Sequence, residues 1–174
     1  MSKTRTARAR RLLRTAGLLL ALPLLSAGAS SCAHGGLVIG TVVTALPHGF
    51  LTISVGTGHL YFYDGFFYRT RGPRYVVVRP PLGVFVPLLP RGYRIVHVRE
   101  VPYAYYRGIF YKEDPRRGWE VVRPPVGAQV DRLPEGAARE RIDGVDYYVY
   151  AGVWYRPTVI GRSTAYVVAD VQRP

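Results

Sequence analysis

The side chains that could catalyse a reaction or hold a metal ion are few and widely separated. The histidines are His34, His48, His59 and His97. None stands at the spacing from another histidine, a cysteine or a paired carboxylate that a zinc site needs. Asp143 and Asp146 could share a calcium ion or act as a carboxylate pair, but a tight turn already explains Asp143. Because Ser163-Thr164 also lacks a partnered base, we expect no enzyme, no metal site and no cofactor.

Tyrosine and the basic side chains carry the remaining chemistry, since the chain contains 14 tyrosines. A basic group beside an aromatic ring can bind sugars through stacking or anions through charge. The same residues can instead cover apolar surface with their stems, as in a plain scaffold. The candidate ligand face comprises Tyr61, Tyr63, Tyr68, Arg69, Tyr106, Tyr111, Lys112, Tyr150, Tyr155 and Arg156.

Three aromatic hairpins must position these side chains. Each consists of two short strands, rich in aromatic and β-branched residues, with a glycine at the turn between them. The hairpins span residues 60–69, 103–112 and 146–156, and their turn glycines are Gly65, Gly108 and Gly152. These glycines lie 43 and 44 residues apart, and a fixed period of this size indicates a repeated architecture.

The type of turn decides which side chains share a face of each hairpin. Asp64-Gly65 suits a two-residue type I′ turn. Ala151-Gly152 suits it less well, and a type I turn with a glycine bulge, which shifts the pairing by one residue, stays open. With two-residue turns, one face carries the tyrosines and the other belongs to the core. The predicted core pairs are Phe62/Phe67, Tyr105/Phe110 and Val149/Trp154.

The sequence predicts an all-β fold of three tandem units of about 44 residues, each of short antiparallel strands and hairpins. The units cover residues 40–82, 83–126 and 127–174, and the third is degenerate. Each begins at a glycine and continues through a Leu-Pro-x-Gly turn, after which the chain runs through about five strands in up-and-down order. A unit of this size is near the limit for folding alone. We therefore expect the units to bury a shared core from Phe67, Phe110 and Trp154.

The repeated sequence motif is long enough to indicate a resemblance to a known family. It reads Leu-Pro-x-Gly-Tyr, then Tyr-x-Tyr-Tyr-x-Gly-x-Phe-Tyr, then Tyr-Val-Val-Val-x-Pro-Pro. It resembles a family of bacterial exported proteins known only as a domain of unknown function. Residues 89–127 match best, residues 40–83 are close, and residues 137–168 are degraded. The resemblance implies β structure and a location in the cell envelope, and it brings no catalytic residue and no ligand.

Residues 1–31 have the order of a secretory signal peptide, with a predicted signal helix. Six basic side chains precede an apolar run that is rich in leucine, and small residues follow it. The apolar run is too short, and is broken by Pro23, to remain as a membrane-spanning helix. A twin-arginine route through Arg10-Arg11 is a looser match than the general secretory route. We therefore expect the protein to be exported.

Cys32 is the only cysteine, and it falls a few residues after the apolar run. The surrounding residues resemble a bacterial lipobox, in which the cysteine becomes the acylated first residue, although Ala29 replaces the usual leucine. Residues 32–39 would then form the lipid-attachment cysteine and its tether. Cleavage after Ala29 by an ordinary signal peptidase is the alternative, and it would leave a soluble periplasmic protein. Lipidation is favoured because a retained free thiol is unusual outside the cell. Attachment to the outer membrane, facing the periplasm, is then expected.

Charge and export together limit the partners. Residues 1–31 hold six of the 24 basic side chains and none of the 11 acidic ones, which leaves the remainder at +7. This excess favours anionic envelope polymers or lipid headgroups as neighbours, although ordinary solubility also explains it. Export argues against nucleic acid. We expect a structural or interaction module of the cell envelope, with a protein or an anionic polymer as partner. The alternatives are a module that binds peptidoglycan or lipopolysaccharide, and a hydrolase.

Overall fold

The computed structural model describes residues 36–171, which belong to one compact unit of the chain. The expected signal helix and Cys32 lie outside the described residues. Residues 36–171 form strands, turns and bends without any helix, which confirms the all-β prediction. Accordingly, no helix in this part of the chain is long and apolar enough to cross a membrane.

In residues 36–171, fifteen strands form three antiparallel sheets of five strands each. The first sheet contains β1 (Val42–Val43), β2 (Leu51–Val55), β3 (Gly58–Tyr63), β4 (Phe66–Arg71) and β5 (Arg74–Val78). The second contains β6 (Phe85–Val86), β7 (Arg94–Val98), β8 (Val101–Tyr106), β9 (Ile109–Asp114) and β10 (Gly118–Val122). The third contains β11 (Gln129–Val130), β12 (Ala138–Ile142), β13 (Val145–Tyr150), β14 (Val153–Ile160) and β15 (Ser163–Ala169).

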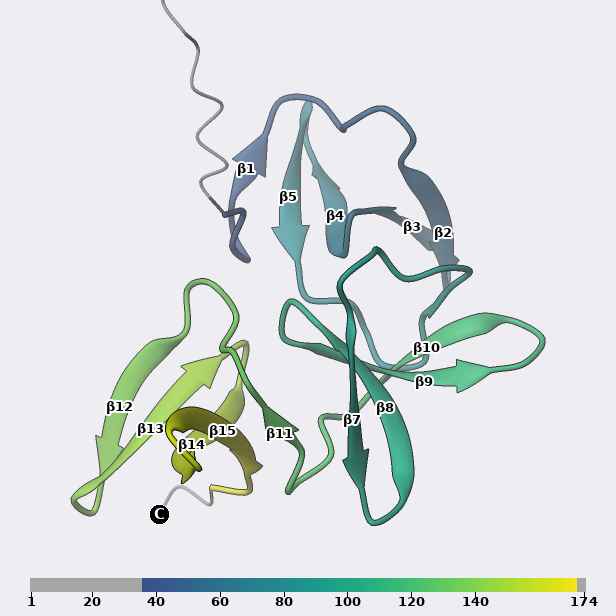
Figure 1. The fold of residues 1–174 in the computed structure, drawn as a ribbon. Coiled ribbons are helices and arrows are strands. Elements are labelled where there is room, and N and C mark those ends of the chain that lie inside the picture. Colours follow the sequence, from purple (N-terminus) through teal and green to yellow (C-terminus); the bar gives the residue numbers. More distant parts are fainter. Residues whose placement is uncertain (1–35, 172–174) are drawn as a thin grey trace, which may run out of the picture. The chain divides into compact units, whose positions relative to one another are not determined.

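All three sheets have the same strand order. In each, four strands form an up-and-down meander, and the short first strand pairs with the last strand of the same sheet. Figure 1 shows the three sheets in blue, teal to green, and green to yellow. The chain passes from the short strand to the meander through the Leu-Pro-x-Gly turn. The glycine of this turn has a φ of 82° at Gly49, 93° at Gly92 and 86° at Gly136. Positive φ angles of this size favour glycine over other residues.

The three aromatic hairpins reverse through two-residue turns. The φ angles are 46° and 81° at Asp64-Gly65 and 51° and 77° at Ala151-Gly152. Two successive positive φ angles are the mark of the type I′ turn, whose twist matches that of the flanking strands. The pairing of β13 with β14 continues in register up to the turn. The glycine-bulge alternative for Ala151 is therefore wrong. The favourable twist of the hairpin outweighs the steric cost of a positive φ angle at alanine.

The predicted cross-strand pairs are present in all three hairpins. They are Phe62 opposite Phe67, Tyr105 opposite Phe110, and Val149 opposite Trp154. In the first two pairs the ring centroids lie 4.9 Å apart and all four side chains are buried. The third pair is only half-buried.

Two apolar clusters join the sheets. The first consists of Leu60, Phe62 and Phe67 of the first sheet with Val84, Val86, Ala104, Tyr111 and Val121 of the second sheet and its entry. The second consists of Tyr105 and Phe110 of the second sheet with Ala128, Val130, Val153, Tyr155 and Val168 of the third sheet and its entry. The expected single core is corrected, because Phe67 and Phe110 serve different interfaces and Trp154 belongs to neither cluster. Trp154 instead packs edge-on against Tyr147 of the same sheet, at 5.9 Å between ring centroids.

One tyrosine of each hairpin is enclosed in this packing. Tyr68, Tyr111 and Tyr155 have exposed fractions of 1%, 0% and 0%. Burial raises the pKa of all three phenols above the ordinary value, so they stay neutral at physiological pH. The hydroxyl of Tyr111 has no hydrogen-bond partner among the described residues. In contrast, the hydroxyl of Tyr105 donates to the Arg132 carbonyl oxygen at 3.2 Å.

Two hydroxyl deletions test this difference. Tyr111→Phe removes a buried polar group that no atom of residues 36–171 satisfies, so we expect unchanged stability or a gain of about 1 kcal/mol. Tyr105→Phe leaves the Arg132 carbonyl oxygen without its donor and should cost about 1 kcal/mol. Urea unfolding of the two variants measures both effects. A loss of stability in Tyr111→Phe would show that its hydroxyl is bonded in solution.

The turn glycines also allow close approach between sheets. Gly108 is buried with a φ of 82°, and a Cβ atom there would lie 2.7 Å from both the Pro134 Cγ atom and the Tyr150 ring. Gly144 has a similar φ of 78°, yet no atom of the described residues lies within 4 Å of the equivalent Cβ position. The two glycines therefore share the backbone constraint and differ in their surroundings.

Alanine at these two glycines separates the two effects. Gly144→Ala should cost about 1 kcal/mol through the backbone alone. Gly108→Ala should cost about 1–3 kcal/mol more, because the second and third sheets must move apart. The measurement is the free energy of unfolding in urea. Equal losses in the two variants would contradict the close approach at Gly108.

Candidate functional site

The structure does not gather the ten candidate residues on one exposed face. Tyr68, Tyr111 and Tyr155 are interior and cannot stack against a ligand from solvent. This corrects the sequence interpretation for these three residues. The physical reason for two of them is that Tyr111 belongs to the apolar cluster between the first and second sheets and Tyr155 to the cluster between the second and third.

The basic candidates lie apart from the buried tyrosines. Arg69, Lys112 and Arg156 are exposed, and each directly follows one of the buried tyrosines in its strand. Because successive side chains of a strand point to opposite faces, these cations cannot share a surface with the tyrosine before them. Tyr61 is half-buried and packs edge-on against Phe50 and Tyr75, at 5.4 and 5.5 Å between ring centroids.

Two of the candidates, Tyr106 and Tyr150, line one groove. The groove has a volume of about 430 Å³ and lies where the hairpin turn of β8 and β9 meets the loop between β11 and β12. We call it the Tyr–Arg groove. Its polar and aromatic walls include Arg94, Tyr105, Tyr106, Arg107, Arg132 and Tyr150. The loop that brings Arg132 here is the Leu-Pro-x-Gly turn of the third sheet, which packs Pro134 against Gly108.

Arg107 is the most strongly held cation of the groove. Its guanidinium lies 4.4 Å from the centroid of the Phe66 ring and 5.3 Å from that of Tyr106. Its Nη2 atom donates to Asp64 Oδ2 at 3.0 Å. Partial burial works to lower the pKa of Arg107, but Tyr106 and Asp64 outweigh it and raise the pKa above the ordinary value. Arg107 is therefore a fixed positive charge between two aromatic rings.

The other charges of the groove are looser. Arg94 and Asp131 form an exposed ion pair at 3.7 Å. Glu135 also lines the groove, so three arginines face two carboxylates. Burial raises the pKa of the Tyr105 and Tyr150 phenols, which stay neutral hydrogen-bonding groups. The arrangement offers a net positive charge, aromatic surface and neutral hydroxyls, which is suited to binding and contains no nucleophile with an adjacent base.

A second, wider groove shares Arg107 with the first. Its volume is about 800 Å³, and its lining includes Leu51, Tyr63, Leu88 and Arg91. Tyr63 and Leu88 have exposed fractions of 38% and 75%. Leu37, from the segment expected to form a tether, borders both grooves and is half-buried.

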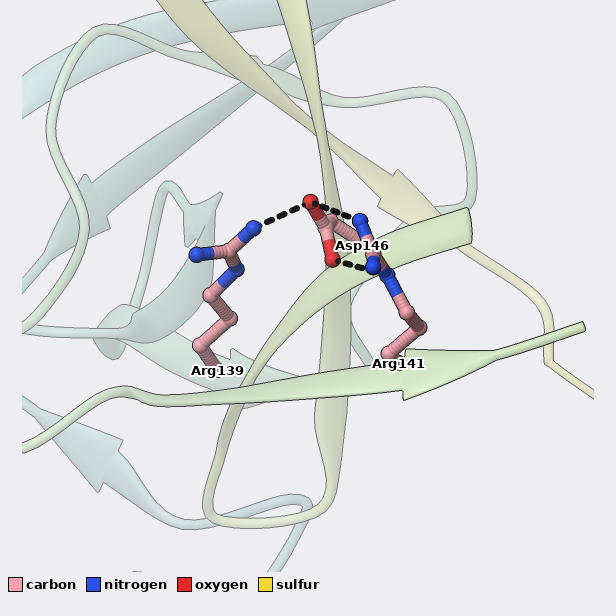
Figure 2. A network of polar contacts seen from close by, with 3 residues as sticks. All are labelled: Arg139, Arg141 and Asp146. Carbon is pink, nitrogen blue, oxygen red and sulfur yellow. Dashed lines mark hydrogen bonds and ion pairs between the residues drawn. The ribbon is translucent and has the colours of Figure 1, made fainter. Parts of the chain in front are cut away.

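Asp146, a possible calcium ligand by sequence, is engaged by two arginines (Figure 2). Its Oδ1 atom accepts from Arg141 Nε at 2.9 Å, and its Oδ2 atom accepts from Arg139 and from Arg141 Nη2. Arg139 and then Arg141 lower the pKa of the Asp146 carboxyl. All three residues belong to the neighbouring strands β12 and β13, so Asp146 stabilises a strand pair.

The remaining candidate ligands stay apart. His48, His59 and His97 are exposed, and His34 lies outside the described residues. Among residues 36–171, no three His, Cys, Asp or Glu side chains are grouped as a metal site would require.

The fold defines an all-β protein built from three successive antiparallel sheets of identical strand order. The chain belongs to the family of unknown function DUF6515, which matches residues 36–172. The matched region spans all three sheets. No curated protein and no solved structure matches the chain.

Sequence reasoning missed Arg94, Arg107 and Arg132. It gave weight to residues that recur in the three hairpins, whereas the first turn position is Asp64, Arg107 and Ala151 in turn. What recurs is the packing, which the tyrosines and phenylalanines provide. The difference at this turn position could have pointed to Arg107. A long cationic side chain on a type I′ turn extends away from its own hairpin and can reach neighbouring surface.

Proposed function

We propose that the protein is exported, anchored to the bacterial outer membrane through Cys32, and acts as a structural or interaction module of the cell envelope. The basic start, the apolar run and the single cysteine after it support export and anchoring. Two or more acyl chains would hold the protein stably where one would not.

The burial of the recurrent aromatic side chains is the observation that carries the scaffold role. The hairpin residues Phe67, Tyr68, Phe110, Tyr111 and Tyr155 are each at most 1% exposed. Most of these recurrent aromatic residues thus serve to join successive sheets. Such an arrangement suits a rigid body that presents a surface to a partner.

Replacement of the cysteine tests the anchor. Cys32→Ser removes the acylated thiol, so the protein should move from the membrane fraction to the soluble periplasmic fraction. Cell fractionation followed by immunoblotting measures this change, and Ser31→Ala serves as the control. If Cys32→Ser fractionates like the parent and the mature N-terminus is Ser30, ordinary cleavage has occurred and the anchor is wrong.

A second function, binding of an anionic envelope glycan, is favoured by the Tyr–Arg groove. Arg107 is held by Asp64 and two aromatic rings, so little side-chain entropy is lost when it meets an anion. Tyr106 and Tyr150 add rings that can stack against sugars. Peptidoglycan and lipopolysaccharide carry the anionic groups and sugar rings that such a groove would bind.

Charge removal in the groove tests this binding. The double variant Arg94→Gln, Arg107→Gln should weaken co-sedimentation with isolated peptidoglycan or lipopolysaccharide about tenfold at low salt. The control is Arg116→Gln, which removes an exposed cation in the turn between β9 and β10. Binding by the parent should also fall with rising salt, because the contact is ionic. Equal losses for the double variant and the control would reduce the effect to net charge and contradict a groove site.

A further inference from the structure

The wider of the two grooves, here called the apolar groove, has walls that suit a hydrocarbon chain. Its volume is about 800 Å³. An apolar cavity of about 150 Å³ already holds a benzene ring. Leu51, Leu88 and Leu89 line the apolar groove together with Phe62 and Phe66. Leu51 and Leu88 have exposed fractions of 41% and 75%. Exposed apolar side chains that gather at one groove mark a binding surface, whereas single exposed ones are ordinary.

Part of the wall of this groove cannot pair with a peptide backbone. Pro47 and Pro90, from the Leu-Pro-x-Gly turns of the first and second sheets, line the groove and have no N–H group to donate. A peptide against these residues would bury backbone carbonyl groups without a partner, at a cost that an acyl chain avoids. The apolar groove therefore fits a hydrocarbon chain better than an extended peptide.

The apolar groove and the Tyr–Arg groove share a border. Leu37, Phe66, Arg107 and Glu135 line both grooves. Arg107 is the fixed cation of this border, since Asp64 and two aromatic rings hold its side chain in place. A ligand that extends from one groove into the other must therefore pass beside a guanidinium group.

Each groove also has an arginine without an ion pair to any of residues 36–171. This arginine is Arg132 in the Tyr–Arg groove and Arg91 in the apolar groove. The opposing charge is Glu135, an exposed carboxylate that lines both grooves. The other two carboxylates of the grooves are paired with arginines. Because two unpaired cations face one unpaired carboxylate, the grooves together favour an anionic ligand.

We propose that the ligand of the Tyr–Arg groove is an acylated anionic glycan, which in the bacterial envelope means lipopolysaccharide. Its sugar lies in the Tyr–Arg groove, its anionic group beside Arg107 and Arg91, and an acyl chain in the apolar groove. The inference rests on the proposed binding of an anionic envelope glycan. It selects lipopolysaccharide over peptidoglycan, which carries no fatty acyl chain. The two grooves supply what such a ligand needs, namely aromatic walls for the sugar, guanidinium groups for the anion and leucines for the hydrocarbon.

Removal of the acyl chains from the ligand tests the inference. The protein is the full-length Cys32→Ser variant, which excludes any contribution from its own anchor. It flows over lipopolysaccharide and over the same lipopolysaccharide de-acylated in alkali, each immobilised through its sugar chain. We expect the acylated form to bind about tenfold more tightly, because the chain buries apolar surface in the groove. Surface plasmon resonance measures the two dissociation constants.

Substitution of one exposed leucine locates the acyl chain. In the same Cys32→Ser background, Leu88→Ser should bring the affinities for the acylated and de-acylated forms close together, because it removes an apolar wall. Leu82→Ser is the matched control, since Leu82 is also an exposed leucine, at 50%, and lines neither groove. The control should keep the preference for the acylated form.

Two results would overturn the inference while glycan binding stands. One is equal affinity for the two forms together with a loss of affinity in the double variant Arg94→Gln, Arg107→Gln. The other is the same effect of Leu88→Ser and Leu82→Ser, which would place the acyl chain elsewhere on the surface. If the double arginine variant binds both forms as tightly as the parent, the glycan site is wrong and the inference fails with it. If neither form binds, the apolar groove has another occupant, such as a protein segment, and the inference is again wrong.

Discussion

Burial of both faces of a single hairpin is the constraint on which the rest of this fold depends. In β4 the neighbouring residues Phe67 and Tyr68 point to opposite sides, and both are almost fully enclosed. The side of β4 that carries Phe67 packs against residues of the second sheet. Each sheet thus supplies only part of its own core, and the two apolar clusters stand in for the disulfides or metal ions that stabilise other small units. The type I′ turns and their glycines follow from this demand, because a bulkier turn would hold the next sheet away.

The sequence predicted the features that repeat and missed those that do not. The period, the five strands in each sheet, the cross-strand pairs of the hairpins and the turns at Asp64 and Asp143 follow from local rules of alternation and turn chemistry. Pairing of the short first strand with the fifth was not foreseen, because two residues carry no periodicity that could be read. The turn at Ala151 needed tertiary information, since the local preference of alanine opposes the observed conformation. Trp154 was expected in the core by analogy with Phe67 and Phe110, but it is half-buried and belongs to neither apolar cluster.

The candidate site illustrates the same division. Comparison of the three repeats pointed to the tyrosines that recur in each hairpin. These tyrosines recur because they pack in the interior, as the full burial of Tyr111 shows. The Tyr–Arg groove is formed instead by residues that do not recur in the other sheets, such as Arg107 and Arg132. The packing of the third sheet on the second brings these residues together. No rule that reads one segment at a time can foresee that meeting. Membership of a family of unknown function assigns no chemistry to this surface.

The pairing of each short first strand with the last strand of its own sheet has a kinetic consequence. Among the described strands, no paired residues are more than 38 positions apart in the chain, the span from Gln129 to Val167. Loops of that length close at modest entropic cost, and a low mean sequence separation of contacts favours rapid folding. The hydrogen bonds of one sheet can therefore form while the following residues are still emerging from the ribosome. Burial of the aromatic faces has to wait for the next sheet, which makes the interval between two sheets the step most exposed to aggregation.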